Sequence, residues 1–160
     1  MSPLEVGAPA PDFELRDQHG QAVTLSAYRG RARALLVFYP YAFSRVCTHE
    51  LGDLREAWDR FDRTDLAVLA ISCDPMFTLR AYAEAEGFPF SLLSDFWPHG
   101  AAASAYGAFD EMRGSARRSS YLVDESGTIR WTRHSPSAEG RDPAEYAAAI
   151  EGLGPPATAG

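Results

Sequence analysis

Hydrophobic and polar positions along this chain fall into blocks that predict alternating strands and helices. Residues 34–39, "ALLVFY", and residues 66–72, "LAVLAIS", are unbroken apolar runs of strand length. Runs of this kind are typical of strands that are buried on both faces of a sheet. We therefore expect the two segments to form neighbouring central strands.

After each of these strands the apolar spacing becomes that of a helix. The first helix is expected to begin at Ser44, because four later apolar residues recur at intervals of three and four and would line one face. These residues are Leu51, Leu54, Trp58 and Phe61. "TLRAYAEAEG" predicts a second helix that ends at Gly87, and "DPAEYAAAIEGL" predicts a last helix near the C-terminus.

The remaining patterned segments predict shorter strands. "QAVTLSAY" indicates a short strand and a turn, "FSLL" a further strand, and "SSYLVDESGTIRWT" a hairpin that turns at "ESG". Together these elements predict an α/β protein with a thioredoxin-like fold, in which helices flank a central mixed sheet. We expect one domain over residues 1–153 and a mobile C-terminal tail over residues 154–160.

Composition and charge narrow the classes of function. The chain has 160 residues, 46% of them hydrophobic, which is enough to bury a core without disulfide bonds. Its net charge of −7 argues against nucleic acid and anionic membranes as partners, because both are bound through basic patches. The start, "MSPLEVGAPAPDF", lacks the basic and apolar regions of a secretory leader, and no run is long enough for a membrane span. We expect a cytoplasmic protein.

The stretch "PYAFSRVC" places a cysteine where a predicted strand runs into a predicted helix. Cys47 would lie in the first helical turn, where unpaired N–H groups and the helix dipole favour an anion such as a thiolate. Pro40 would end the strand, and Ser44 would cap the helix with its hydroxyl near the sulfur. Glu50 would share a helix face with Cys47, so a cation must lie close if the thiolate is to be stable.

A buried structural cysteine is the alternative, since cysteine is among the most frequently buried residue types. Neither Cys47 nor Cys73 belongs to a CxxC motif or a zinc-type cluster, and we expect both thiols to be reduced. A reactive role is favoured by "ARRSSYLVD" further along the chain, where Arg118 stands one or two residues before a predicted strand.

This set of residues resembles the peroxiredoxins, whose signature is Pro-x-x-x-Thr/Ser-x-x-Cys. Pro40, Ser44 and Cys47 match the signature, with Glu50 at the family's acidic position and Arg118 at its distal arginine. Ser44 stands where many members carry threonine. "GAPAPDFELRDQHGQAVTL" and "LLSDFWPHGAAASAYG" are also similar to the family, and "DFWPHG" most resembles its AhpE-like one-cysteine branch.

The resemblance implies a thiol-specific peroxidase that reduces hydrogen peroxide, organic hydroperoxides or peroxynitrite. Cys47 would become a sulfenic acid, while Arg118 would stabilise both the thiolate and the leaving oxygen. Ser44 and the N–H groups of Val46 and Cys47 would bind the peroxide, and Glu50 would orient the arginine. An external thiol, or a glutaredoxin- or thioredoxin-like reductant, would recycle the enzyme. No cofactor is expected, and a homodimer is expected because family members commonly pair.

Two other functions stay open at this point. A thioredoxin-like disulfide oxidoreductase would normally use the second cysteine of a CxxC motif, which this chain lacks. A peroxide-sensing redox binding module would use the same sulfenic acid to change its affinity for a partner. Cys73, at the end of a predicted strand, is expected to pack in the core rather than to resolve the sulfenic acid.

The other candidate residues have simpler interpretations. His49 should face away from Cys47 and the other histidines are scattered, so we expect neither a Cys–His pair nor a metal site. Arg113 and Arg117 are expected to be surface charges. Three aromatic residues are expected either in the core or in a collar at a dimer contact; they are Tyr41, Phe43 and Trp97.

Overall fold

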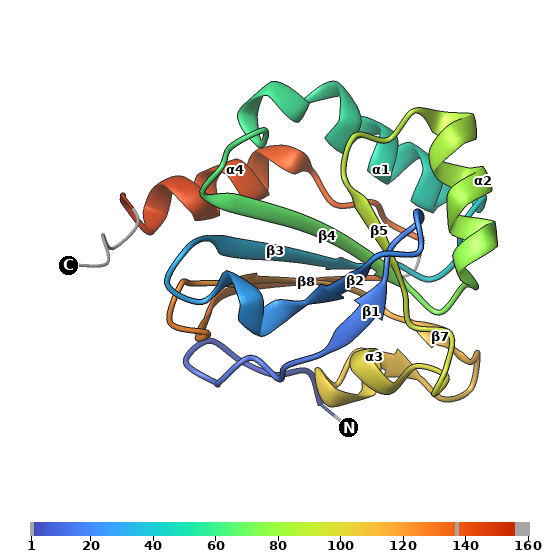
Figure 1. The fold of residues 1–160 in the computed structure, drawn as a ribbon, viewed down its shortest axis with the longest axis horizontal. Helices are drawn as coiled ribbons and strands as arrows, with labels where there is room; N and C mark the ends of the chain where they lie inside the picture. Colours follow the sequence, from blue (N-terminus) through green and yellow to red (C-terminus); the bar gives the residue numbers. More distant parts are fainter. Residues whose placement is uncertain (1, 137, 156–160) are drawn as a thin grey trace.

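The computed structural model describes residues 2–136 and 138–155 and consists of two sheets, four α-helices and two short 3-10 helices (Figure 1). The strands are β1 Glu14–Arg16, β2 Ala22–Thr24, β3 Arg33–Phe38, β4 Leu66–Ser72, β5 Ser91–Ser94, β6 Phe109–Asp110, β7 Ser115–Ala116, β8 Arg118–Val123 and β9 Ile129–Ser135. The helices are α1 Arg45–Glu56, α2 Met76–Glu86, α3 Ala101–Ala105 and α4 Pro143–Gly152, with 3-10 turns at Leu25–Tyr28 and Trp58–Arg60.

The larger sheet has seven strands in the order β2-β1-β5-β4-β3-β8-β9. β3, β4 and β5 are parallel, whereas β8 pairs antiparallel with β3, and β9 pairs antiparallel with β8. The two long apolar runs of the sequence are therefore neighbouring central strands, as predicted. Every residue of β3 is buried, because helices or loops cover both faces of the sheet at this strand.

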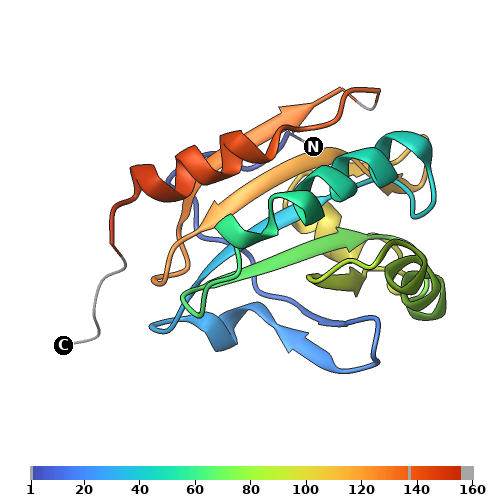
Figure 2. The same cartoon turned by 90° about the horizontal axis from the view of Figure 1, so that it is seen from above.

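Three helices cover one face of the large sheet, and α3 and the N-terminal segment cover the other (Figures 1 and 2). Alternate residues of β3 point to opposite faces, so Leu35 and Val37 pack with α1, α2 and α4. Leu36 and Phe38 pack against α3 and the segment around Ala10. The predicted α/β layers with a central mixed sheet are confirmed.

The first helix is shorter than the apolar spacing predicts. α1 begins after Ser44 as expected but ends at Glu56, and a separate 3-10 turn carries Trp58. The prediction that one helix extends to Phe61 is therefore wrong. Phe61 is nevertheless fully buried, because the 3-10 turn directs its ring into the same core as Leu51 and Leu54.

The second and last helices follow the predictions closely. The last residue of α2 is Glu86, and Gly87 caps the helix. Gly87 adopts the left-handed conformation, with φ 64°, that is common at a helix C-terminus. α4 begins after Asp142, whose side chain accepts a hydrogen bond from the N–H of Ala144. The predicted hairpin is β8–β9, and its turn includes Gly127. β1, α3 and the small β6–β7 sheet were not predicted.

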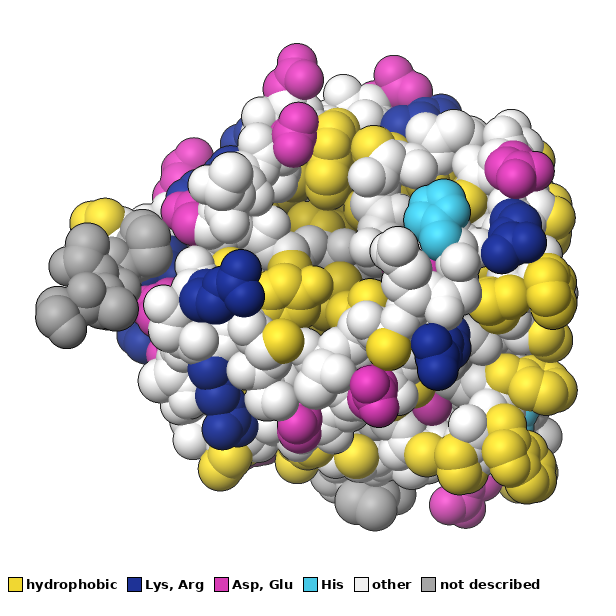
Figure 3. All heavy atoms as spheres, viewed as in Figure 1, with side chains coloured by type: hydrophobic (Ala, Val, Ile, Leu, Met, Phe, Trp, Pro, Cys, Tyr) yellow, Lys and Arg dark blue, Asp and Glu magenta, His cyan; other side chains and the backbone are white. Residues whose placement is uncertain are grey.

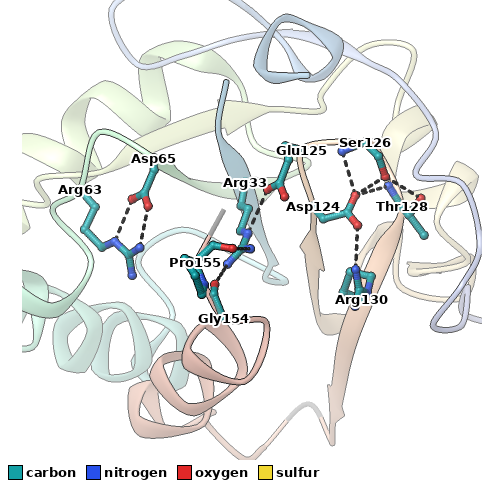
Figure 4. A network of polar contacts seen from close by, with 10 residues as sticks. All are labelled: Arg33, Arg63, Asp65, Asp124, Glu125, Ser126, Thr128, Arg130, Gly154 and Pro155. Carbon is teal, nitrogen blue, oxygen red and sulfur yellow. Dashed lines mark hydrogen bonds and ion pairs between the residues drawn. The ribbon is translucent and has the colours of Figure 1, made fainter. Parts of the chain in front are cut away.

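Ion pairs and hydrogen bonds hold the turns around the start of β3 (Figure 4). Arg33 bonds the Glu125 carboxylate at 3.0 Å and the carbonyl oxygens of Gly154 and Pro155 at 2.8 and 3.2 Å. This network lies at the opposite end of β3 from Cys47. The rest of the predicted mobile tail, residues 156–160, lies outside the described residues. No helix in the described ranges is long and apolar enough to cross a membrane.

Candidate active site

The candidate site forms where β3 passes into α1. The N–H of Tyr39 still bonds to the carbonyl of Ile71 on β4, but Pro40 has no N–H with which to continue the ladder. Phe43 then adopts φ 68°, a left-handed conformation that is strained for a large side chain. The chain turns there, and α1 begins two residues later.

Ser44 is the N-cap of α1, as the sequence predicts. Its Oγ accepts a hydrogen bond from the N–H of Cys47 at 3.4 Å, and its carbonyl accepts from the N–H of Thr48 at 2.9 Å. Cys47 is therefore fixed in the first turn, at the positive end of the helix dipole, and its side chain is fully buried.

Arg118 approaches the cysteine from the neighbouring strand. Its Nη2 donates to Cys47 Sγ at 3.2 Å, and its Nη1 donates to Glu50 Oε1 at 2.7 Å. β8 runs antiparallel to β3 with Ser120 opposite Val37, so the start of β8 lies beside the end of β3. Arg118 is the first residue of β8, not a residue before the strand as predicted.

The two adjacent arginines have opposite environments. Arg118 is buried whereas Arg117 is exposed, because consecutive side chains near a strand point to opposite sides. Arg113 is also exposed and forms an ion pair with Asp110 at 3.8 Å. Both predictions of a surface position are therefore confirmed, and the structure brings only Arg118 of these three arginines to the cysteine.

A second buried arginine, which sequence reasoning missed, completes the cluster. Arg141 lies in the loop between β9 and α4, and its backbone N–H, Nε and Nη2 all donate to the Glu50 carboxylate at 2.6 to 2.7 Å. Its Nη1 donates to Ser120 Oγ at 2.8 Å, and that hydroxyl also bonds the hydroxyl of Tyr146 on α4. No periodicity or motif marks this loop arginine in the sequence.

The charged side chains beside the Cys47 sulfur carry a net positive charge. Burial by itself would raise the pKa of Glu50, but hydrogen bonds from Arg141 and the positive charges of Arg141 and Arg118 hold this pKa below its ordinary value. Two guanidinium groups and one carboxylate leave a net charge of about +1 next to Cys47. A thiolate neutralises that charge, so the arrangement supplies the cation that the position of Glu50 requires.

The aromatic residues around the site are exposed. The exposed fraction is 43% for Tyr41, 54% for Phe43 and 81% for Trp97, so a core position is excluded for all three. Phe43 lies against Tyr82 of α2, with ring centroids 4.8 Å apart. The hydroxyl of Tyr41 donates to the carbonyl of Arg113 at 3.2 Å and so links the loop before α1 to the turn between β6 and β7.

The second cysteine lies in a different environment. Cys73 directly follows β4 and is buried, and burial together with the negative charges of Asp95 and Asp74 raises its pKa to about 12. Its thiol therefore stays protonated at neutral pH, as expected of a packing residue. Both cysteines are free.

His49 does not join the site. The His49 side chain is exposed and lies 3.5 Å from Asp53 on the outer side of α1. Among residues 2–136 and 138–155, no group of three or more histidine, cysteine or acidic side chains is arranged to hold a metal ion.

A sheet of this topology, with a buried cysteine at a helix N-terminus and an arginine on its sulfur, defines a thiol-dependent peroxidase of the peroxiredoxin class. The chain belongs to the AhpC/TSA family, whose model matches residues 6–132. It is 49% identical over 150 residues to alkyl hydroperoxide reductase E of Mycobacterium tuberculosis, covering 94% of this chain and 98% of the relative. A putative peroxiredoxin Bcp of Haemophilus influenzae is 38% identical over 81% of this chain and 85% of its own length.

Solved structures agree with this assignment. The crystal structure of Enterococcus faecalis AhpC matches with a TM-score of 0.84 and 27% identity, covering 96% of this chain and 93% of that one. The peroxidoxin BcpB of Mycobacterium tuberculosis shares the fold with a TM-score of 0.83 at 24% identity, over 94% of this chain and 98% of that one. The predicted family and thioredoxin-like fold are thus confirmed.

Proposed function

We propose that Cys47 is the peroxidatic cysteine of this peroxidase and that hydrogen peroxide, organic hydroperoxides or peroxynitrite are its substrates. In this proposal Arg118 and Ser44 contact the reacting groups, Pro40 shapes the site, and Glu50 orients Arg118. The observation that carries the proposal is the 3.2 Å contact between Arg118 Nη2 and Cys47 Sγ at the N-terminus of α1. The whole of residues 1–153 serves as one domain for this chemistry.

The proposed reaction is a two-electron transfer from sulfur to oxygen. The Cys47 thiolate attacks one peroxide oxygen, the S–O bond forms and the O–O bond breaks. The departing oxygen leaves as an alkoxide or hydroxide, which takes up a proton and gives an alcohol or water, or, from peroxynitrite, as part of a nitrite ion. The cationic Arg118 stabilises the thiolate before the attack and the departing oxygen during it.

The sulfenic acid on Cys47 is returned to the thiol by an external reductant. A first thiol condenses with it to form a mixed disulfide and water, and a second thiol releases the cysteine. A small thiol or a glutaredoxin- or thioredoxin-like protein would supply these electrons. Because such reductants are kept reduced in the cytosol, a cytoplasmic location is part of this proposal.

Steady turnover distinguishes this enzyme from the remaining alternatives. The protein is mixed with hydrogen peroxide and an excess of a reducing thiol, and peroxide consumption is followed over many equivalents. The proposal predicts catalytic consumption that is abolished in Cys47→Ser and kept in Cys73→Ser. Consumption that stops after one equivalent would support a redox-sensing binding module, and equal loss in both variants would support a two-cysteine disulfide mechanism.

A homodimer through the edge that carries the site is also part of the proposal. Hydrophobic side chains gather along the edge where α2, α3 and β7 lie (Figures 1 and 3). Six large exposed hydrophobic residues belong to the loops and helix starts at this end of the sheet: Tyr41, Phe43, Phe77, Phe96, Trp97 and Met112. Exposed apolar groups of this number on one edge are typical of a protein interface.

Sedimentation tests the dimer. Trp97→Glu places a charge in the exposed edge and should shift the protein towards a monomer, because an unpaired charge in an apolar interface is unfavourable. Val6→Glu is the matched control, since Val6 is similarly exposed but lies in the N-terminal segment. A wild-type monomer at micromolar concentrations, or an equal shift in both variants, would reject this edge as the interface.

A further inference from the structure

His99, in the "DFWPHG" segment, ties two loops together through both of its ring nitrogens. Nδ1 lies 3.1 Å from the carbonyl oxygen of Phe96, and Nε2 lies 2.7 Å from the carbonyl oxygen of Gly114. Carbonyl oxygens only accept hydrogen bonds, and a neutral imidazole has one N–H whereas an imidazolium has two. The protonated ring therefore satisfies both contacts, and the neutral ring satisfies one.

The same turn is held from its other side by the loop of the candidate active site. The hydroxyl of Tyr41 donates to the carbonyl of Arg113 at 3.2 Å, next to the carbonyl of Gly114 that faces His99. Two adjacent carbonyls thus receive side chains from two different loops. Tyr41 directly follows Pro40, so the turn of residues 110–114 connects His99 to the loop that leads to the cysteine.

The ring of His99 is exposed to solvent on one side and contacts two aromatic rings. The rings of Phe96 and Phe109 approach it edge to face, with centroids 5.8 and 6.0 Å away. Gly100, with φ 72°, brings the backbone so close to Phe109 that a Cβ at this position would clash with the ring. A larger residue at this position would displace Phe109.

Several charged groups lie on the elements around His99. Burial raises the pKa of Asp95, opposed by hydrogen bonds from the N–H groups of Ala103 and Ala102 and by the charge of His99. On the turn, Asp110 accepts hydrogen bonds from backbone N–H groups and pairs with Arg113, and Glu111 is exposed. The carboxylates of Asp95 and Asp110 therefore accept hydrogen bonds from backbone N–H groups. The ring nitrogens of His99 face carbonyl oxygens instead.

We propose that His99 is a positioning residue for the peroxidase site. It acts on Tyr41 through the turn of residues 110–114, and it does so fully only while its ring carries two protons. This inference rests on the proposed function of Cys47. When one proton leaves, one carbonyl faces a ring lone pair instead of a donor, and the segment is released from one of its two contacts. The turn and the Tyr41 loop are then held less firmly.

The test compares single-turnover oxidation of Cys47 by hydrogen peroxide in the wild type and His99→Gln. Dividing the two rate constants at each pH removes the pH dependence that the two proteins share. Glutamine offers one N–H-bearing group, so it matches the neutral ring but not the protonated one. We expect the wild type to be about threefold faster while the ring carries two protons and the ratio to approach one when it carries a single proton.

A double-variant cycle tests the route through Tyr41. At the pH where the wild type and His99→Gln differ most, Tyr41→Phe and His99→Gln should together slow oxidation no more than the larger single effect, because both act on the same turn. His49→Gln is the control, since His49 is exposed on the outer side of α1, and its rate ratio should not change with pH. A ratio for His99→Gln that is flat with pH, or additive effects in the cycle, would overturn the proposal.

The same data distinguish a failure of the proposed function of Cys47 from a failure of the proposed role of His99. A wild-type protein in which peroxide does not oxidise Cys47 rapidly rejects the proposed function and the role of His99 with it. Rapid wild-type oxidation with a flat ratio rejects only the role of His99. Nitrogen chemical shifts of the His99 ring, followed over the same pH range, give a readout without turnover: the rate ratio should fall together with the loss of a ring proton, and a ratio that does not follow the protonation of the ring contradicts the two-donor arrangement.

Discussion

Nη2 of Arg118 lies 3.2 Å from Sγ of Cys47, although the two residues are 71 positions apart in the chain. The same guanidinium holds Glu50 through its other amino group, at 2.7 Å. The antiparallel pairing of β8 with β3 sets this geometry, because it brings the start of one strand to the end of the other. The cation beside the sulfur is therefore fixed before any substrate arrives.

Replacing Arg118 should therefore affect the chemistry, whereas replacing its neighbour should not. Arg118→Ala removes the cation beside the sulfur and should slow the oxidation of Cys47 by peroxide about 100-fold, equivalent to about 2.7 kcal/mol. Arg117→Ala, at an exposed position, is the matched control. Stopped-flow oxidation of both variants measures the effect. Equal rates in the two variants would remove Arg118 from the reaction.

Arg141 should contribute more to stability than a partly exposed arginine that pairs with a single carboxylate. Arg141→Leu leaves the buried carboxylate of Glu50 with fewer donors and should lower the free energy of unfolding by about 3 kcal/mol. Arg133→Leu breaks a partly exposed pair with Glu145 and should cost under about 1 kcal/mol. Denaturant unfolding of both variants checks the difference, and equal losses would contradict the buried network as described.

Glu50 should give the fold a specific dependence on acid. Its pKa in the folded protein is held below the ordinary value of 4.5, so the ionised carboxylate stabilises the fold above that pH. This contribution is lost as pH falls from about 4.5 through the folded-state pKa. The wild type should therefore lose more stability over this range than Glu50→Gln.

The exposed Glu56 provides the control for this measurement. Glu56→Gln should follow the wild type as pH falls, because the side chain of Glu56 is largely in solvent. Urea unfolding at several pH values between neutrality and the acid range gives the three curves. Parallel curves for the wild type and Glu50→Gln would show that the carboxylate is not held in its ionised form.

Cys73 should be inert in the folded protein. With its pKa raised to about 12, its thiol should resist alkylation near pH 8, while Cys73 in urea should react as readily as any free cysteine. Mass spectrometry of the alkylated peptides measures both. A Cys47–Cys73 disulfide after one equivalent of peroxide, with turnover lost in Cys73→Ser, would instead assign it a resolving role.

The parts of the fold and site that sequence reasoning found are those with a local signal. The run "ALLVFY", the proline after it and the serine before the helix place Cys47 correctly, because strand end and N-cap depend on neighbouring residues. Arg118 was found through family resemblance, since nothing local indicates which of two adjacent arginines points inwards.

Other features depend on contacts that a linear pattern does not contain. Arg141 is in an irregular loop, and its partner Glu50 is 91 positions away. The end of α1 at Glu56 was not predicted either. A 3-10 turn keeps Phe61 buried just as a continued helix would, so the apolar spacing is the same in both cases. α3 is five residues long, and its N-terminal N–H groups are bonded by the carboxylate of Asp95, several positions earlier.

The central claim is that the cluster of Arg118, Glu50 and Arg141 makes Cys47 a peroxide-reactive thiolate. Single-turnover mixing with one equivalent of hydrogen peroxide, followed by trapping and mass spectrometry of the sulfenic acid, tests it most directly. The account predicts oxidation of Cys47 that is orders of magnitude faster than that of free cysteine at the same pH, with Cys73 untouched. Oxidation no faster than that of free cysteine, or spread equally over both thiols, would contradict it.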